Sequence, residues 1–225
     1  MNQLKKYIDA NRQRFIDELI EYLRFPSVSA QSAHKKDMAD CARWLAGHAK
    51  SFGLKSRVHK TDGHPIVTLA TPRKRNSAKP HFLVYGHYDV QPPEPLELWN
   101  SPPFEPTLRG RNLFARGASD NKGQLFAHLA ALRGWFEVAG GPPVNLRLLI
   151  EGEEEIGSPS LGEFVAAHAD ELRAEWGVVS DGPMFAPGVP AVSYGLRGLA
   201  YFQLDISAAS ADLHSGTHGG AVPTP

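Results

Sequence analysis

Histidine and carboxylate side chains follow several apolar segments of this sequence, and side chains of these types can bind a divalent cation. His87 and Asp89 come after the apolar run 82–85. Residues two apart in an extended segment point the same way, so Asp89 is close enough to orient the His87 ring. A His-x-Asp triplet is also common in ordinary turns, so this pair alone leaves a metal site and a turn as alternatives.

The segment 151–155 reads Glu-Gly-Glu-Glu-Glu and follows the apolar run 144–150. Like charges repel, and the repulsion grows where a strand end is partly buried. A solvated acidic loop is the alternative, but it fits poorly between an apolar strand and a helix that begins near Ser158. A bound cation would remove the conflict. Glu154 and Glu155 could then divide the work, one binding the metal and the other taking a proton from water.

Two further carboxylates stand at comparable places. Asp120 lies just before a helical pattern, where an N-cap is the ordinary explanation, and Asp181 stands in an Asp-Gly pair typical of a turn. His87, the glutamates and Asp181 nevertheless all follow apolar strands, and sites in open α/β sheets form at the carboxyl ends of strands. An oxygen-rich set with few imidazoles suits zinc, manganese or cobalt in a hydrolytic pair.

The elements that must position these residues alternate between helical and strand patterns. Apolar residues at helical spacing predict helices over about 4–23, 38–52, 122–138 and 158–168. Apolar runs predict buried strands over 66–70, 81–85, 144–150, 176–180 and 191–194. This alternation predicts an α/β fold with helices layered on a sheet.

The pattern of polar and apolar residues changes near Arg197. Polar and apolar residues alternate over 201–207, which predicts a strand with one face in water, typical of an antiparallel sheet. We therefore expect a first domain over 1–197 and the beginning of a second over 198–225.

Composition excludes several classes of function. Lys plus Arg and Asp plus Glu number 24 each, so no net field favours nucleic acid or an anionic membrane. The basic run 73–75 is expected to be a solvated turn. The single cysteine, Cys41, excludes an internal disulfide and a cysteine-built zinc site. The N-terminus lacks the apolar core of a signal peptide, and no apolar stretch is long enough to span a bilayer, which favours a cytoplasmic protein.

Four segments together resemble the dinuclear zinc peptidases, a family that includes carnosine dipeptidase, carboxypeptidase G, acetylornithine deacetylase and succinyl-diaminopimelate desuccinylase. They are residues 85–92, 116–123, 150–158 and 179–181. The resemblance runs from about Leu4 to the last residue. The wording of 85–92 and the Gly-x-Arg-Gly join at 195–198 are most similar to the dipeptidase branch.

The resemblance implies a layered αβα catalytic domain with a mixed, mostly parallel sheet, and an inserted α+β lid domain that mediates dimerisation. It also implies a role for each candidate residue. The metal ligands are His87 and Asp181 on a first metal, Asp120 bridging both metals, and Glu155 on a second metal, with Asp89 as a partner behind the ligands. Glu154 is implied as the general base, and His214 as the lid histidine that enters the partner subunit's site and stabilises the tetrahedral intermediate. A cis bond between Asp120 and Asn121 is implied as well.

The implied activity is hydrolysis of a peptide or amide bond in dipeptides or small peptides, with two divalent ions, zinc first and manganese or cobalt as alternatives. An N-acyl amino acid deacylase on the same scaffold remains open, as does an inactive truncated homologue that acts as a binding or dimerisation partner. The family requires a last histidine ligand well after the lid, whereas this chain ends at Pro225. We therefore expect a fragment of a longer enzyme that is inactive alone.

Overall fold

The computed structural model describes residues 2–72, 78–195, 197–205 and 214–221. The basic run expected to form a turn, 73–75, lies outside these ranges. The chain divides into two units, Met1–Pro183 and Met184–Pro225, and each is considered by itself. The domain boundary predicted near Arg197 stays a prediction.

The first unit is built on a five-stranded sheet of order β1-β2-β6-β3-β7. Strand β2 is antiparallel to both of its neighbours, whereas β6–β3 and β3–β7 are parallel pairs, so four strands share one direction. This confirms the predicted mixed, mostly parallel sheet. The strands are β1 (Lys55–His59), β2 (Ile66–Ala70), β3 (His81–His87), β6 (Asn145–Glu151) and β7 (Trp176–Val179). A separate hairpin pairs β4 (Thr107–Arg109) with β5 (Asn112–Phe114).

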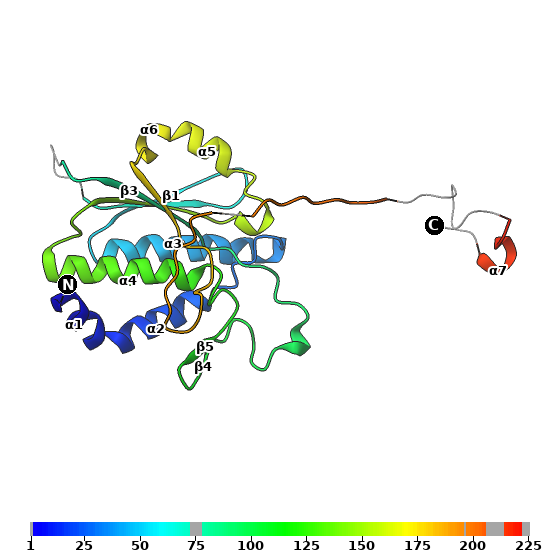
Figure 1. Ribbon diagram of the computed structural model, residues 1–225, viewed down its shortest axis with the longest axis horizontal. Coiled ribbons are helices and arrows are strands. Elements are labelled where there is room, and N and C mark those ends of the chain that lie inside the picture. The colour runs from blue at the N-terminus through cyan, green and yellow to red at the C-terminus, as the bar shows by residue number, and fades with distance from the viewer. Residues whose placement is uncertain (1, 73–77, 196, 206–213, 222–225) are drawn as a thin grey trace. The chain divides into compact units, whose positions relative to one another are not determined.

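Helices cover both faces of the sheet, as the predicted αβα layering requires (Figure 1). One layer contains α1 (Asn2–Ala10), α2 (Arg12–Leu23), α3 (Lys35–Ser51) and α4 (Lys122–Ala139). The other contains α5 (Leu161–Ala167) and α6 (Ala169–Leu172). Short 3-10 turns lie at Ser32–His34, Leu96–Leu98 and Glu154–Ile156.

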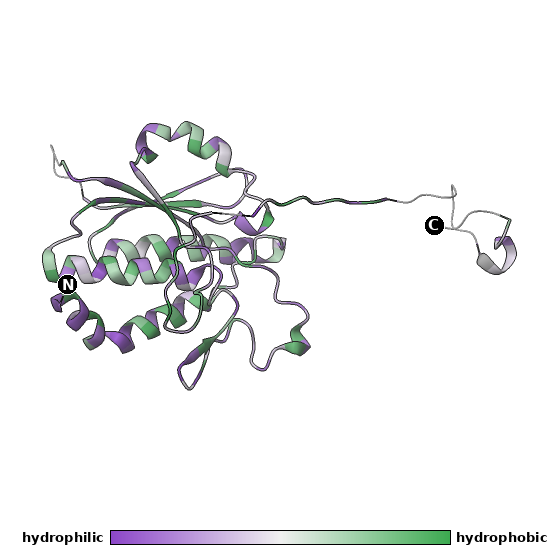
Figure 2. Cartoon of the chain, viewed as in Figure 1, coloured by the Kyte–Doolittle hydropathy of each residue, from purple (hydrophilic) through white to green (hydrophobic). Residues whose placement is uncertain are grey.

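Alternation along the strands gives the sheet a core on each face, and Figure 2 shows the central strands in the colour of hydrophobic residues. Leu148 and Ile150 of β6 pack in the larger core with α2, α3 and α4, while Leu149 between them packs on the other side against Phe164 and Leu172 of α5 and α6. Successive side chains of a strand point to opposite faces of the sheet. Because helices cover both faces, almost every residue of such a strand is apolar, which explains the unbroken apolar segments in the sequence.

Two helix predictions differ from the structure: the segment predicted as one helix over about 4–23 forms two helices separated at Asn11, and the helix predicted to open at Ser158 begins at Leu161. Ser160 is the N-cap residue of α5, and Ser158 has a φ of 53° that a helix cannot include. The Ser158 hydroxyl donates instead to Glu151 Oε1 at 2.8 Å. The N-cap predicted at Ser158 therefore lies two residues before the observed N-cap, and the Ser158 side chain makes a tertiary hydrogen bond instead of a cap.

Three strand predictions differ from the structure, one of them in part and two throughout their described residues. The segment Trp176–Val179 is a strand, but it is an edge strand with Trp176 61% exposed rather than a buried one. No strand forms over 191–194 or over the described part of 201–207, and Val192 and Tyr194 are exposed. Apolar or alternating residues form a strand only where a neighbour accepts the backbone hydrogen bonds, and the described residues offer these segments none.

None of the helices in the described part of the chain has both the length and the apolar character needed to cross a bilayer.

Candidate metal centre

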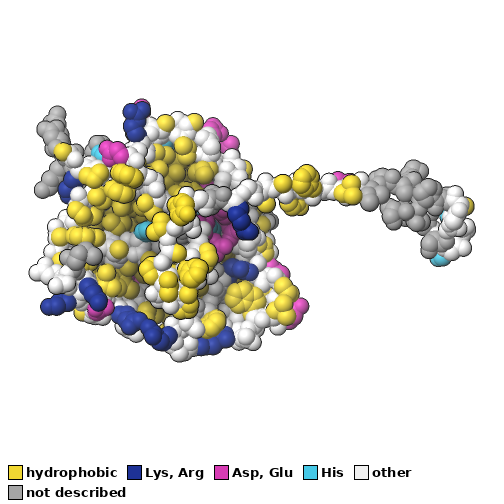
Figure 3. All heavy atoms as spheres, viewed as in Figure 1, with side chains coloured by type: hydrophobic (Ala, Val, Ile, Leu, Met, Phe, Trp, Pro, Cys, Tyr) yellow, Lys and Arg dark blue, Asp and Glu magenta, His cyan; other side chains and the backbone are white. Residues whose placement is uncertain are grey.

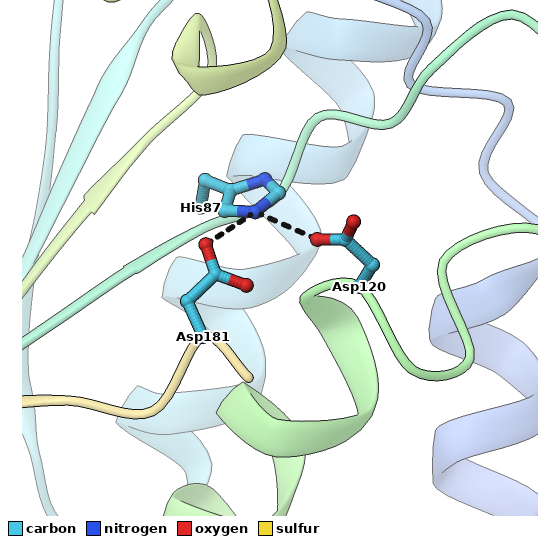
Figure 4. A group of neighbouring side chains, drawn as sticks. All are labelled: His87, Asp120 and Asp181. Carbon is cyan, nitrogen blue, oxygen red and sulfur yellow. Dashed lines mark ion pairs between the residues drawn. The ribbon is translucent and has the colours of Figure 1, made fainter. Parts of the chain in front are cut away.

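His87 is the last residue of β3 and stands at the centre of a group of carboxylates (Figure 4). Its side chain is fully buried, and its Nε2 atom lies 3.2 Å from Asp120 Oδ1 and 3.3 Å from Asp181 Oδ2. Its Nδ1 atom lies 3.1 Å from the main-chain oxygen of Asp89. In the neutral form of the ring that binds a metal, a proton on Nδ1 is donated to that oxygen and the Nε2 lone pair faces the carboxylates.

Asp120 and Asp181 reach His87 from two different elements. Asp120 precedes α4, and the peptide bond between Asp120 and Asn121 is cis, as the family resemblance implied. Asp181 follows β7, whose parallel pairing with β3 brings the ends of the two strands to one edge of the sheet. The sequence-based argument that these residues converge at the carboxyl ends of parallel strands therefore agrees with the arrangement in the fold.

Glu154 and Glu155 begin the 3-10 turn after β6, and Asp89 holds that turn in place. The buried Asp89 carboxylate accepts the main-chain N–H of Glu154 at 3.3 Å and that of Glu155 at 3.1 Å. Glu154 Oε2 then lies 3.9 Å from His87 Nε2. Gln91 donates to Glu155 Oε2 at 2.8 Å and so fixes one oxygen of that carboxylate.

The charges of the group shift its proton affinities. Burial lowers the pKa of His87, but the hydrogen bond and charge of Asp89, together with the charges of Asp181 and Glu154, outweigh burial and raise the pKa to about 9. Burial raises the pKa of Glu154, and the charges of Glu155 and Asp181 add to that rise while His87 opposes it. Burial also raises the pKa of Glu155, with the Gln91 hydrogen bond opposing it. The carboxylates thus repel one another around a single imidazole.

The residues present fit a divalent metal ion. His87, Asp120 and Asp181 each offer a ligand atom, and these atoms lie within 4.8 Å of one another; the same holds for His87, Glu154 and Glu155. His87 Nε2 is buried and has no hydrogen-bond partner among the described residues. A buried imidazole nitrogen without a hydrogen-bond partner and the carboxylate oxygens that face it together form the donor set expected for zinc, manganese or cobalt.

Figure 3 shows a small cluster of acidic side chains on the face in view, and several Lys and Arg side chains along the lower edge of that face. His214, the predicted lid histidine, belongs to the second unit, where its exposed ring accepts the main-chain N–H of Gly216 at 3.0 Å. Leu213, which begins the lid motif, lies outside the described residues. The role of His214 therefore stays a prediction.

Sequence reasoning missed two polar residues that contact this group, Asn121 and Gln91. Asn121 stands before a helix and Gln91 stands before two prolines, so each resembles an ordinary capping or loop residue. Their contacts join residues distant in the chain, and a single sequence carries no signal of such pairs.

An αβα domain with one buried histidine and several carboxylates beyond its parallel strands is typical of metal-dependent hydrolases. The chain belongs to the Peptidase family M20/M25/M40, whose family model matches residues 83–222. Two relatives are each 32% identical to it over its full length: the Cys-Gly metallodipeptidase dug1 of Schizosaccharomyces pombe and the Beta-Ala-His dipeptidase of Mus musculus. The chain covers 50% of the first relative and 48% of the second.

Solved structures agree with this assignment. Human carnosine dipeptidase 1 superposes with a TM-score of 0.80 at 27% identity, over 98% of this chain and 49% of that one. The dipeptidase Dug1p of Saccharomyces cerevisiae gives 0.79 at 26% identity, over 99% of this chain and 49% of that one. The chain thus spans about half the length of the relatives it matches.

Proposed function

We propose that the protein containing this chain is a metal-dependent hydrolase that cleaves the peptide bond of dipeptides or small peptides. The observation that carries the proposal is the approach of Asp120 and Asp181 to the unpartnered Nε2 atom of buried His87. The relatives named for Cys-Gly and Beta-Ala-His dipeptidase activity support the dipeptide substrate over an N-acyl amino acid.

In this proposal His87, Asp120 and Asp181 hold a first divalent ion, and Glu155 holds a second with Asp120 as the shared ligand. Zinc is the preferred metal, with manganese or cobalt as alternatives, because imidazole and carboxylate donors suit all three. Support comes from the two overlapping groups of ligand atoms, which surround the same histidine.

Bound divalent ions supply an activated water and polarise the scissile carbonyl. Glu154 acts as general base: it accepts a proton from the water and passes it to the leaving amine. Asp89 keeps Glu154 and Glu155 in position by accepting both of their main-chain N–H groups. Gln91 donates a hydrogen bond to one oxygen of the Glu155 carboxylate and so favours one orientation of that side chain.

Three further features remain proposals that rest on the sequence and its family resemblance. They are a homodimer formed through a lid domain, entry of His214 into the partner subunit's site to stabilise the tetrahedral intermediate, and a cytoplasmic location. The inserted lid would begin after about residue 197.

The proposal is tested by assaying the natural protein that contains this sequence on Cys-Gly and β-Ala-His, with release of free amino acids as the readout. We expect hydrolysis with zinc or manganese, loss on chelation, and recovery when metal returns. Asp181→Asn should weaken metal binding by more than the ~10–100-fold typical of a residue behind the ligands. Asp170→Asn on exposed α6 is the matched control and should change neither metal binding nor activity. A metal-loaded protein that releases acyl groups from N-acyl amino acids but leaves dipeptides intact would overturn the proposal.

A further inference from the structure

The side chain of Asn121 joins the ends of β3 and β7. It is 1% exposed, its Oδ1 atom accepts the main-chain N–H of His87 at 3.3 Å, and its Nδ2 atom donates to the main-chain oxygen of Ser180 at 2.9 Å. The last pair of the β3–β7 ladder is Tyr85 with Val179. Asn121 therefore connects the two strands just beyond their ladder, next to His87 at the end of β3 and to Asp181 after β7.

Helix capping does not explain this side chain. Asn121 is the N-cap residue of α4, with φ of −116° and ψ of 6°, yet its side chain makes no capping hydrogen bond. Asparagine is favoured at this position because its oxygen usually accepts an N–H from the first turn. Here both polar atoms of the amide point to the strand ends instead, so the residue serves the sheet edge rather than the helix.

The space that Asn121 occupies is provided by Gly86. A Cβ atom added at Gly86 would lie 2.8 Å from Asn121 Oδ1, closer than such atoms approach. Gly86 lies inside β3, between Tyr85 and His87. Glycine weakens the interior of a strand, and its presence there often marks a close approach by another group. The glycine is therefore explained by close approach of the Asn121 amide.

A second contact from α4 reaches the same point. His128 Nε2 lies 2.8 Å from the Ser180 hydroxyl oxygen. Helix α4 thus holds Ser180 by its main-chain oxygen through Asn121 and by its side chain through His128. Because Ser180 precedes Asp181, this helix fixes the start of the segment that carries the carboxylate.

We propose that Asn121 is a positioning residue that sets the separation of His87, Asp120 and Asp181, and so determines how tightly the first divalent ion is held. Asn121 does not contact the ion in this proposal. It follows Asp120 directly, and its side chain hydrogen-bonds to the backbone of His87 and to that of the residue before Asp181. One residue is therefore linked to all three proposed ligands and sets the distances between them. The inference rests on the proposed metal centre.

The test measures binding of Zn²⁺ and Mn²⁺ to the metal-free natural protein by calorimetric titration. Asn121→Leu keeps the volume of the side chain but removes both hydrogen bonds, and it should weaken the tighter ion by ~10–100-fold. Leu129→Ala, in the buried core under α4, is the control for lost stability alone. It should lower the unfolding temperature and leave the metal affinity unchanged.

Gly86→Ala provides a second route to the same result if Asn121→Leu fails to fold. The added methyl group should displace the Asn121 amide and weaken the tighter ion by a similar ~10–100-fold. Wild-type metal affinity in Asn121→Leu, or in Gly86→Ala, overturns the inference and leaves the metal centre standing. A wild-type protein that binds neither ion shows instead that the metal centre itself is wrong, and the inference falls with it.

Discussion

At the scale of single residues, the four glutamates of 151–155 have two different environments. Glu151 is buried and accepts hydrogen bonds from the Tyr85 hydroxyl at 2.5 Å and from Ser158. Glu153 is buried and accepts the main-chain N–H groups of His64 and Ser160. The sequence predicted a charge conflict that a cation relieves, but donors within the protein already bind both carboxylate oxygens of Glu153 and one oxygen of Glu151, whose Oε2 atom has no hydrogen-bond partner among the described residues. Only Glu154 and Glu155 are left to face His87.

Neighbouring glutamates should therefore respond differently to one conservative change. Glu154→Gln removes the proposed base and should lower kcat by ~10²–10⁴-fold, with metal affinity and unfolding temperature close to those of the wild type. Glu153→Gln replaces one accepting oxygen by an NH₂ group that faces a main-chain N–H, and should cost ~1–3 kcal/mol of stability. Steady-state kinetics on Cys-Gly and urea unfolding separate the two effects.

Equal loss of kcat in the two variants would contradict this division of roles. It would indicate that the whole turn, rather than the Glu154 carboxylate, controls activity.

At the scale of elements, sequence patterns located nearly all of the first unit's helices and central strands, because their apolar periodicity reflects burial against two cores. Strand β1 was missed, since an edge strand with Lys55 and Arg57 carries no apolar run. The strand predicted over 191–194 was wrong, because an apolar run records a demand for burial and not the presence of a partner strand. The candidate ligand residues were proposed from their places after strands, or before a helix for Asp120, and from the family resemblance, but the contacts of Asn121 depend on packing that only the fold reveals.

The junction before α4 should be intolerant of a single methyl group. A Cβ atom at Gly123 would lie 2.1 Å from the main-chain oxygen of Ala118, and backbone cannot move aside as a flexible side chain can. We expect Gly123→Ala to shift the first turn of α4, reduce stability by ~1–3 kcal/mol as overpacking does, and weaken metal binding through Asp120.

Gly47→Ala in α3 is the matched control. Nothing lies within 4 Å of its added Cβ, so the gain in helix propensity should stabilise the protein by ~0.5–1 kcal/mol. Chemical denaturation of both variants tests the pair, and a Gly123→Ala protein as stable as wild type with full metal affinity would refute the expectation.

At the scale of the whole molecule, a histidine in the helical layer makes unfolding depend on pH. His48 stacks on Trp44 at a centroid distance of 4.8 Å and packs edge-on against Phe52. Burial lowers the pKa of His48 to about 4, while the charge of Glu18, 3.7 Å away, opposes that shift and Arg133 adds to it. The ring is neutral in the folded state at pH values where the unfolded chain already binds a proton.

The sign follows from this difference. A histidine whose folded pKa lies below the unfolded value of ~6.5 contributes stability that is complete above pH ~6.5 and is lost as the pH falls toward the folded value. We expect His48 to account for up to roughly 3 kcal/mol of destabilisation between pH 7 and pH 4. Urea unfolding across this range should show a smaller decline in His48→Gln than in the wild type. Parallel curves for the two proteins would contradict the assignment.

The position of β6 between β2 and β3 also determines the order in which the protein can assemble. Strands β2 and β3 leave the ribosome long before β6, at a synthesis rate of ~5–20 residues per second, yet β6 is the strand that pairs with both of them. Until it arrives, each presents an unpaired apolar edge on which another chain can add. Glu154 and Glu155 follow β6 in the chain. A nascent chain therefore exposes unpaired apolar strand edges while the proposed metal site still lacks these two carboxylates. Joining β2 to β3 and bringing Glu154 and Glu155 to the acidic group are therefore one event, and β7 with Asp181 completes both the sheet and the group later.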